Sequence, residues 1–104
     1  MEKRTDKRHR CEASIALSCF NKEKMFRAKM LNYSKDGMYF ESEVLLKEGA
    51  NIYFQMNDCQ FDASDPERYD GLRTVSVARV KWSKDIGGER ANHFGFGVKY
   101  MEYY

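Results

Sequence analysis

The feature that most constrains the fold of this chain is a period of two in its apolar residues. Near the C-terminus, every second position carries a large apolar side chain: Phe94, Phe96, Val98 and Tyr100. Successive side chains of an extended strand point to opposite faces, so this repeat places all four on one face. A stable amphipathic helix needs apolar residues three or four positions apart over a longer stretch. The sequence has no convincing segment of that kind, and the chain is predicted to be all-β.

Six segments with this alternation follow one another, separated by turn-forming residues. The predicted strands comprise residues 13–20, 25–33, 38–43, 51–56, 72–83 and 93–103. A barrel hides the unpaired edges that such short strands would otherwise expose, so we expect a closed or nearly closed barrel. The length of 104 residues suits one domain. We assign residues 13–104 to this domain, residues 58–70 to an acidic loop within it, and residues 1–12 to a flexible basic arm.

The positive charge of the chain is concentrated at its start. The formal net charge is only +2, yet the first ten residues include five cations, namely Lys3, Arg4, Lys7, Arg8 and Arg10. Such a cluster suits a local anionic partner better than a long polyanion. No apolar run approaches the roughly 20 residues of a membrane span, and no apolar segment follows the basic start as in a secretory signal. We therefore expect a cytoplasmic protein without membrane insertion.

The residues that usually carry metal or catalytic chemistry form no recognisable set. The three cysteines, Cys11, Cys19 and Cys59, contain no CxxC pair, and the histidines His9 and His93 add no zinc-like spacing. We expect reduced cysteines, no metal and no cofactor. The sequence also shows no paired nucleophile and base and no phosphate-binding P-loop, so the chain is not expected to be an enzyme.

The segment from Leu31 to Met38 is a polar corner between two alternating segments. Its Asp36-Gly37 pair predicts a tight hairpin turn, in which Gly37 supplies a positive φ at little cost. Asn32 and Ser34 stand two positions apart, so on extended backbone their side chains point to the same side. The corner is therefore predicted to present a small polar face.

Together, the arm and the corner resemble the PilZ family. Arg4 to Arg8 match its RxxxR segment, and Asn32 to Gly37 match its [D/N]xSxxG turn. Two late segments, Ala78 to Trp82 and Phe94 to Tyr100, are similar to the family's "RVxW" and "GxGVxF" strands. The resemblance covers nearly the whole chain. It implies a six-stranded antiparallel β-barrel that binds the bacterial second messenger cyclic di-GMP and passes the signal on.

The chemistry of the matched residues suits that ligand. The guanidinium groups of Arg4 and Arg8 can grip phosphate, pair with guanine O6 and N7, or stack on a base. Asn32 offers an amide oxygen to guanine N–H groups, Ser34 offers a hydroxyl, and Gly37 lets the backbone approach the ligand. Auxiliary phosphate contacts are expected from four further residues of the arm: Lys3, Lys7, His9 and Arg10.

Our hypothesis is that cyclic di-GMP docks residues 3–10 of the arm against the barrel and that a partner protein reads the new surface. Homodimerisation is left open. One alternative is a PilZ-fold adaptor that acts through protein contacts without binding the ligand. Another is a small nucleic-acid-binding barrel, against which the modest net charge argues, as do Trp82, Phe94 and Phe96, which are predicted to be core residues.

Overall fold

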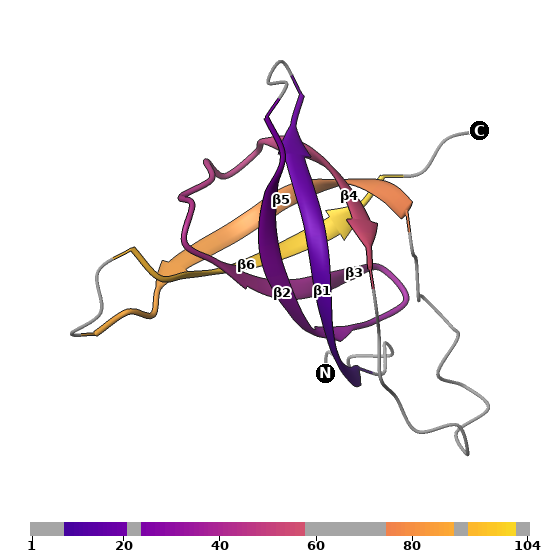
Figure 1. The fold of residues 1–104 in the computed structure, drawn as a ribbon. Helices are drawn as coiled ribbons and strands as arrows, with labels where there is room; N and C mark the ends of the chain where they lie inside the picture. The colour runs from indigo at the N-terminus through magenta and orange to yellow at the C-terminus, as the bar shows by residue number, and fades with distance from the viewer. Residues whose placement is uncertain (1–7, 21–23, 58–74, 89–91, 102–104) are drawn as a thin grey trace, which may run out of the picture.

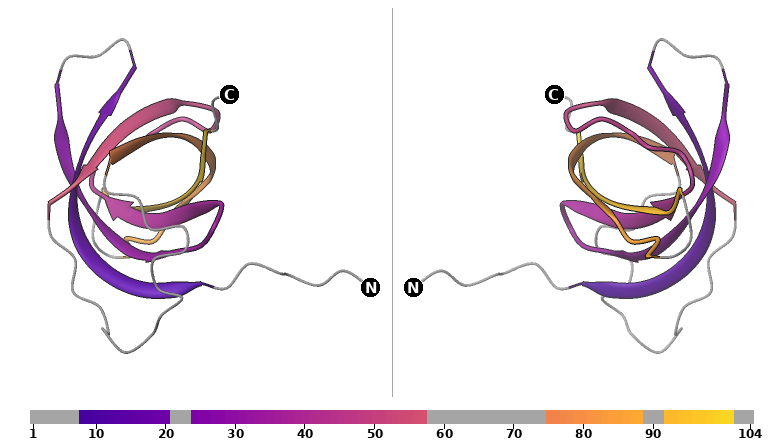
Figure 2. Two further views of the ribbon diagram at one scale, coloured as in Figure 1. Left: turned by 90° about the vertical axis from the view of Figure 1, so that its right-hand side faces the viewer. Right: turned by 90° about the vertical axis from the view of Figure 1, so that its left-hand side faces the viewer.

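Six antiparallel strands form a closed barrel in the computed structural model of this chain, which describes residues 8–20, 24–57, 75–88 and 92–101. The strands are β1 (His9–Cys19), β2 (Phe26–Tyr33), β3 (Gly37–Ser42), β4 (Asn51–Met56), β5 (Val75–Asp85) and β6 (Phe94–Tyr100). Around the barrel their order is β1-β2-β3-β6-β5-β4, and pairing of β1 with β4 closes the ring (Figure 1). Figure 2 shows this ring from two opposite sides. The predicted all-β barrel is confirmed.

The alternation of the sequence explains which side chains fill the barrel. Most inward-facing positions are buried, while most outward-facing positions are exposed or half-buried. The largest fully buried side chains are Tyr33, Phe40, Phe54, Phe96, Ile15 and Leu17. Phe40 and Phe96 lie on neighbouring strands with their ring centroids 5.3 Å apart. Burial of this apolar set supplies the main driving force for closing the barrel.

The predicted strand boundaries agree closely for β2, β3 and β4, but β1 begins earlier than predicted. It starts at His9 rather than at residue 13. His9 and Arg10 lie opposite Tyr33 and Asn32 of β2, so the neighbouring strand continues the backbone ladder into the charged segment. The local charge pattern therefore misled the prediction, because an outward-facing cation does not prevent a residue from pairing. The predicted loop at residues 58–70 lies outside the described residues.

The cysteines differ from the sequence-based prediction. Cys11 faces the barrel interior with 1% of its surface exposed, and it is disulfide-bonded, so the expectation of reduced cysteines is wrong for this residue. Cys19 is a free thiol. Cys59 lies outside the described residues. The inward position of Cys11 follows from the early start of β1, which continues the alternation toward the N-terminus.

A bulge in β5 changes the direction of one large side chain. Val80 lies opposite Val98 of β6, but the next paired residue, Trp82, lies opposite Gly97, so Lys81 is an extra residue. A bulge of this kind reverses the alternation beyond it. Ala78 and Val80 are buried, whereas Trp82 is 39% exposed. The prediction that Trp82 belongs to the core is therefore wrong.

None of the described residues belongs to a helix long and apolar enough to cross a membrane. Within the same residues, no group of three or more histidine, cysteine or acidic side chains is arranged to hold a metal ion.

Candidate functional site

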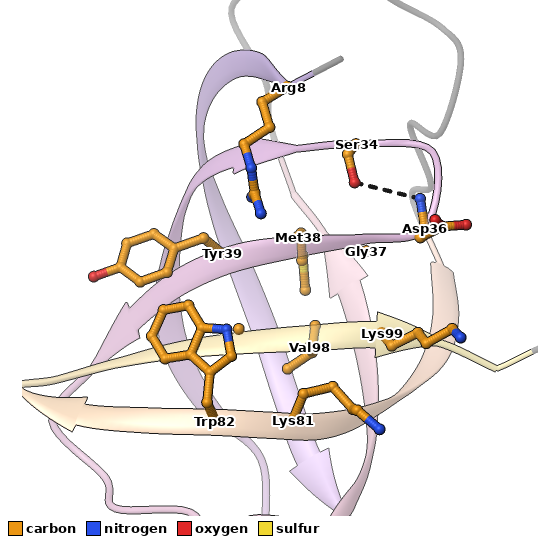
Figure 3. Close-up of a pocket in the computed structure, with 11 residues that line it drawn as sticks. Arg8, Ser34, Asp36, Gly37, Met38, Tyr39, Lys81, Trp82, Val98 and Lys99 are labelled. Carbon is orange, nitrogen blue, oxygen red and sulfur yellow. Dashed lines mark hydrogen bonds between the residues drawn. The ribbon is translucent and has the colours of Figure 1, made fainter. Parts of the chain in front are cut away.

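A groove of about 220 Å³ lies where the start of β1 and the β2–β3 turn meet the outer face of β3, β6 and β5. Arg8, Ser34 and Gly37 line one part of it, and Tyr39 and Trp82 line another. In Figure 3 the guanidinium group of Arg8 points down over β3 toward the groove. The remaining lining residues are Asp36, Met38, Lys81, Gly97, Val98 and Lys99. The groove thus combines several cations with two aromatic rings.

The structure brings together the last residue of the RxxxR segment and the polar turn. The Nη1 atom of Arg8 donates a hydrogen bond to the Oδ1 atom of Asn32 at 3.3 Å. Arg8 stands just before β1, and the pairing of β1 with β2 delivers it beside this asparagine. Asn32 does not itself line the groove, so its visible role is to hold Arg8. Two segments 24 residues apart therefore form one local structure.

Most of the other arm residues that were predicted to contact the ligand lie outside the described residues. Lys3, Arg4 and Lys7 lie outside the described residues, and for His9 only the strand position in β1 is described. Arg10 is exposed on β1 and is not among the residues that line the groove.

The turn before β3 is held by hydrogen bonds on both sides. The Ser34 amide donates to the Gly37 carbonyl at 2.7 Å, and the Asp36 amide donates to the Ser34 hydroxyl at 3.3 Å. From the neighbouring strand, the amide of Tyr100 donates to the Asp36 carbonyl at 2.7 Å. Ser34 is only 6% exposed, yet it lines the groove. A ligand therefore meets a preformed turn at this point.

The predicted reason for glycine at position 37 is wrong. Among the described residues, positive φ values occur at Gly49, Gly88 and Asn92, but not at Gly37. A Cβ atom at Gly37 would instead overlap the backbone carbonyl of Val98 on β6. Glycine is required here because two strands approach too closely for any side chain to fit between them.

An aromatic wall, formed by Tyr39 and Trp82, closes the other end of the groove. Their ring centroids are 5.6 Å apart and their planes differ by 26°. The Nζ atom of Lys84 lies 5.6 Å from the Trp82 centroid and 5.7 Å from the Tyr39 centroid. The wall offers ring surface to a planar group, because stacking on an aromatic side chain depends little on the identity of a base.

Two glycines of β6 make the aromatic wall possible. A Cβ atom at Gly97 would overlap the Trp82 indole, and one at Gly95 would overlap the Tyr39 hydroxyl. The rings therefore lie flat against bare backbone. The sequence carried a signal for this arrangement, since the two glycines alternate with inward-facing apolar residues. The sequence does not show which side chains lie across from these glycines, so the aromatic wall was not predicted.

Tyr39 is linked by a hydrogen bond to a small polar cluster behind the wall. Its hydroxyl donates to Glu41 Oε2 at 3.2 Å, and His93 Nε2 lies 3.3 Å from Glu41 Oε1. Burial raises the pKa of the Tyr39 hydroxyl above its ordinary value, and the negative charge of Glu41 and the hydrogen bond to it add to the rise. Glu41 thus positions Tyr39 and favours its neutral form.

The raised pKa of Tyr39 predicts a loss of stability in alkali. Because the folded state holds this proton more tightly than the unfolded state, its contribution is complete below the unfolded pKa, near 10, and is lost as pH rises through the folded pKa. Denaturant unfolding between pH 8 and pH 11.5 should show a smaller alkaline loss for Tyr39→Phe than for the wild type. Equal losses would contradict the assignment, and Tyr53→Phe, on β4, is the matched control.

Comparisons with known proteins address the fold rather than the family. No family model matches the chain, and no curated protein matches it significantly. A solved structure of the K. pneumonia MrkH–c-di-GMP complex is similar, with a TM-score of 0.65 and 11% sequence identity. The similarity covers 100% of this chain and 47% of that chain, so the chain spans about half the length of its neighbour. At this identity the likeness concerns the barrel fold.

Proposed function

We propose that this chain is a cyclic di-GMP receptor and that the groove beneath Arg8 is its binding site. The observation that carries the proposal is the hydrogen bond from Arg8 to Asn32. It joins the two sequence segments that resemble the PilZ motifs, and it does so at the rim of a groove that contains cations and two stacked aromatic rings. The similar fold of a protein solved in complex with c-di-GMP supports the same ligand.

The groove suits an anionic ligand with planar bases. Arg8 and the Ser34 hydroxyl supply donors for a phosphate or a guanine edge, since a guanidinium fork matches either group. The aromatic wall supplies the surface on which a guanine stacks. Asn32 acts on Arg8 rather than on the base, which differs from the direct guanine contact that the resemblance implies.

Signalling in this proposal depends on the arm. Arg4 and the lysines beside it close over the bound ligand and create a surface that a partner protein reads. Fixing each backbone residue costs about 1–2 kcal/mol, and charge-assisted hydrogen bonds of about 1.5–3 kcal/mol each offset that cost. The role is binding rather than catalysis, and the messenger places it in the bacterial cytoplasm.

Isothermal titration calorimetry tests the proposal. Cyclic di-GMP should bind with measurable heat and a defined stoichiometry, whereas cyclic di-AMP should bind far more weakly because adenine lacks the O6 acceptor and reverses the donor pattern of that edge. Absence of binding, or equal affinity for both dinucleotides, would overturn the proposal.

One observation favours a second candidate, a site for single-stranded nucleic acid. Trp82 is exposed rather than buried, and Lys84 lies over its ring, a combination suited to stacking bases. A short oligonucleotide added to the same calorimetry series distinguishes the two. Tight binding with a steep dependence on salt would favour the oligonucleotide over the cyclic dinucleotide.

A further inference from the structure

A second groove, of about 260 Å³, lies beside the first on the outer face of β5 and β6. Arg79, Lys81 and Lys99 line it, together with Tyr100 and Met101 at the end of β6. Lys81 and Lys99 also line the first groove, so the two grooves adjoin. Figure 3 shows these two lysines pointing away from the aromatic wall. We call Arg79, Lys81 and Lys99 the cation cluster.

The cation cluster is not explained by the stability of the barrel. Arg79 and Lys99 lie directly opposite each other on antiparallel strands, a position in which like charges destabilise a sheet. No carboxylate among the described residues forms an ion pair with any of the three cations. All three side chains are exposed and therefore accessible to a ligand.

One member of the cation cluster is held in place. The Nε atom of Arg79 donates a hydrogen bond to Asn51 Oδ1 at 3.1 Å, and Asn51 lies opposite it on β4. This bond uses one edge of the guanidinium group and leaves its terminal nitrogen atoms free to donate. An oriented guanidinium fork beside two flexible ammonium groups is well suited to a phosphate.

The width of the sheet separates Arg79 from the β2–β3 turn. Gly37, Lys99 and Arg79 lie in one row across β3, β6 and β5. Adjacent strands are about 4.8 Å apart, so Arg79 stands roughly 10 Å from Gly37 across the sheet. The cation cluster therefore extends two strands beyond the turn, across β6 to β5.

We propose that the cation cluster is a second phosphate subsite, which takes a phosphate group beyond the one held under Arg8. The binding of a phosphate group is inferred from the cation cluster alone. The identity of the ligand that carries this phosphate group rests on the proposed function. Lys81 and Lys99, shared by both grooves, connect the two positions. The bound phosphate removes the repulsion between Arg79 and Lys99, and the fold is thereby stabilised when the subsite is filled.

Thermal unfolding with sodium tripolyphosphate at constant ionic strength tests the subsite. A saturating concentration should raise the Tm of the wild type by roughly 5 °C, because a ligand that binds only the folded state stabilises it. The double variant Arg79→Gln/Lys99→Gln should lose this rise while its Tm without tripolyphosphate is unchanged or higher. The matched control Lys24→Gln/Arg27→Gln removes the same charge from exposed positions at the start of β2 and should keep the rise.

Two results would overturn the subsite: no rise in the wild type, or an equal loss of the rise in the control. Calorimetry with cyclic di-GMP then separates the subsite from the proposed function. A roughly tenfold weaker affinity of the single variant Arg79→Gln, at 1.4 kcal/mol per tenfold change, would show that the ligand reaches the cluster, because Arg79 lines the second groove and not the first. An unchanged affinity would overturn that part of the proposal. If cyclic di-GMP does not bind the wild type but tripolyphosphate stabilises it as expected, the proposed function fails and the subsite stands.

Discussion

Replacing Arg8 with alanine is expected to weaken cyclic di-GMP binding by about 10- to 100-fold. Arg8 reaches the groove from just before the start of β1, and its charge-assisted hydrogen bonds to phosphate or guanine are each worth about 1.5–3 kcal/mol. At 1.4 kcal/mol per tenfold change in affinity, the loss of one such contact gives this range. Calorimetry on the wild type and the variant at one ionic strength measures it.

The control for this variant is Arg27→Ala. Arg27 is exposed on β2 and does not line the groove, so its loss removes the same charge without removing a contact. Its affinity should stay close to that of the wild type. Equal affinities for Arg8→Ala and the wild type would reject Arg8 as part of the clamp, even if the ligand itself binds.

Replacing Gly37 with alanine is expected to destabilise the barrel by about 3 kcal/mol, because the added methyl group overlaps backbone rather than a movable side chain. The obstructing atom is the carbonyl oxygen of Val98, in the middle of β6. Relief of the overlap requires β3 and β6 to separate, and the hydrogen bonds of the turn depend on their positions. Equilibrium denaturation measures the loss.

Gly97→Ala provides the contrast. Its methyl group would meet the Trp82 indole, which is partly exposed and can rotate away from the sheet. The destabilisation should be about 1 kcal/mol or less, and a change in tryptophan fluorescence should report the displaced ring. A loss of stability as large as that of Gly37→Ala would contradict the distinction between backbone and side-chain obstruction.

Part of the candidate site could be predicted from local sequence patterns, and part of it could not. Arg8, Ser34 and Gly37 were predicted as ligand residues, and the structure places all three at the groove. Tyr39 and Trp82, which also line the groove, were not predicted. Their outward faces meet only because β5 carries a bulge and because two glycines of β6 leave room beneath the rings.

The all-β class, the approximate limits of β2, β3 and β4 and the faces of regularly alternating segments were decided by the amino-acid sequence alone. The physical reason is that alternation depends only on the geometry of a single extended strand, so Phe94 and Phe96 face inward whichever strand lies beside them. The tertiary structure alone decided the early start of β1, the need for glycine at position 37 and the facing pair of Arg79 and Lys99. Each of these depends on the register between segments distant in the chain, and one inserted residue in a pairing reverses every side chain beyond it.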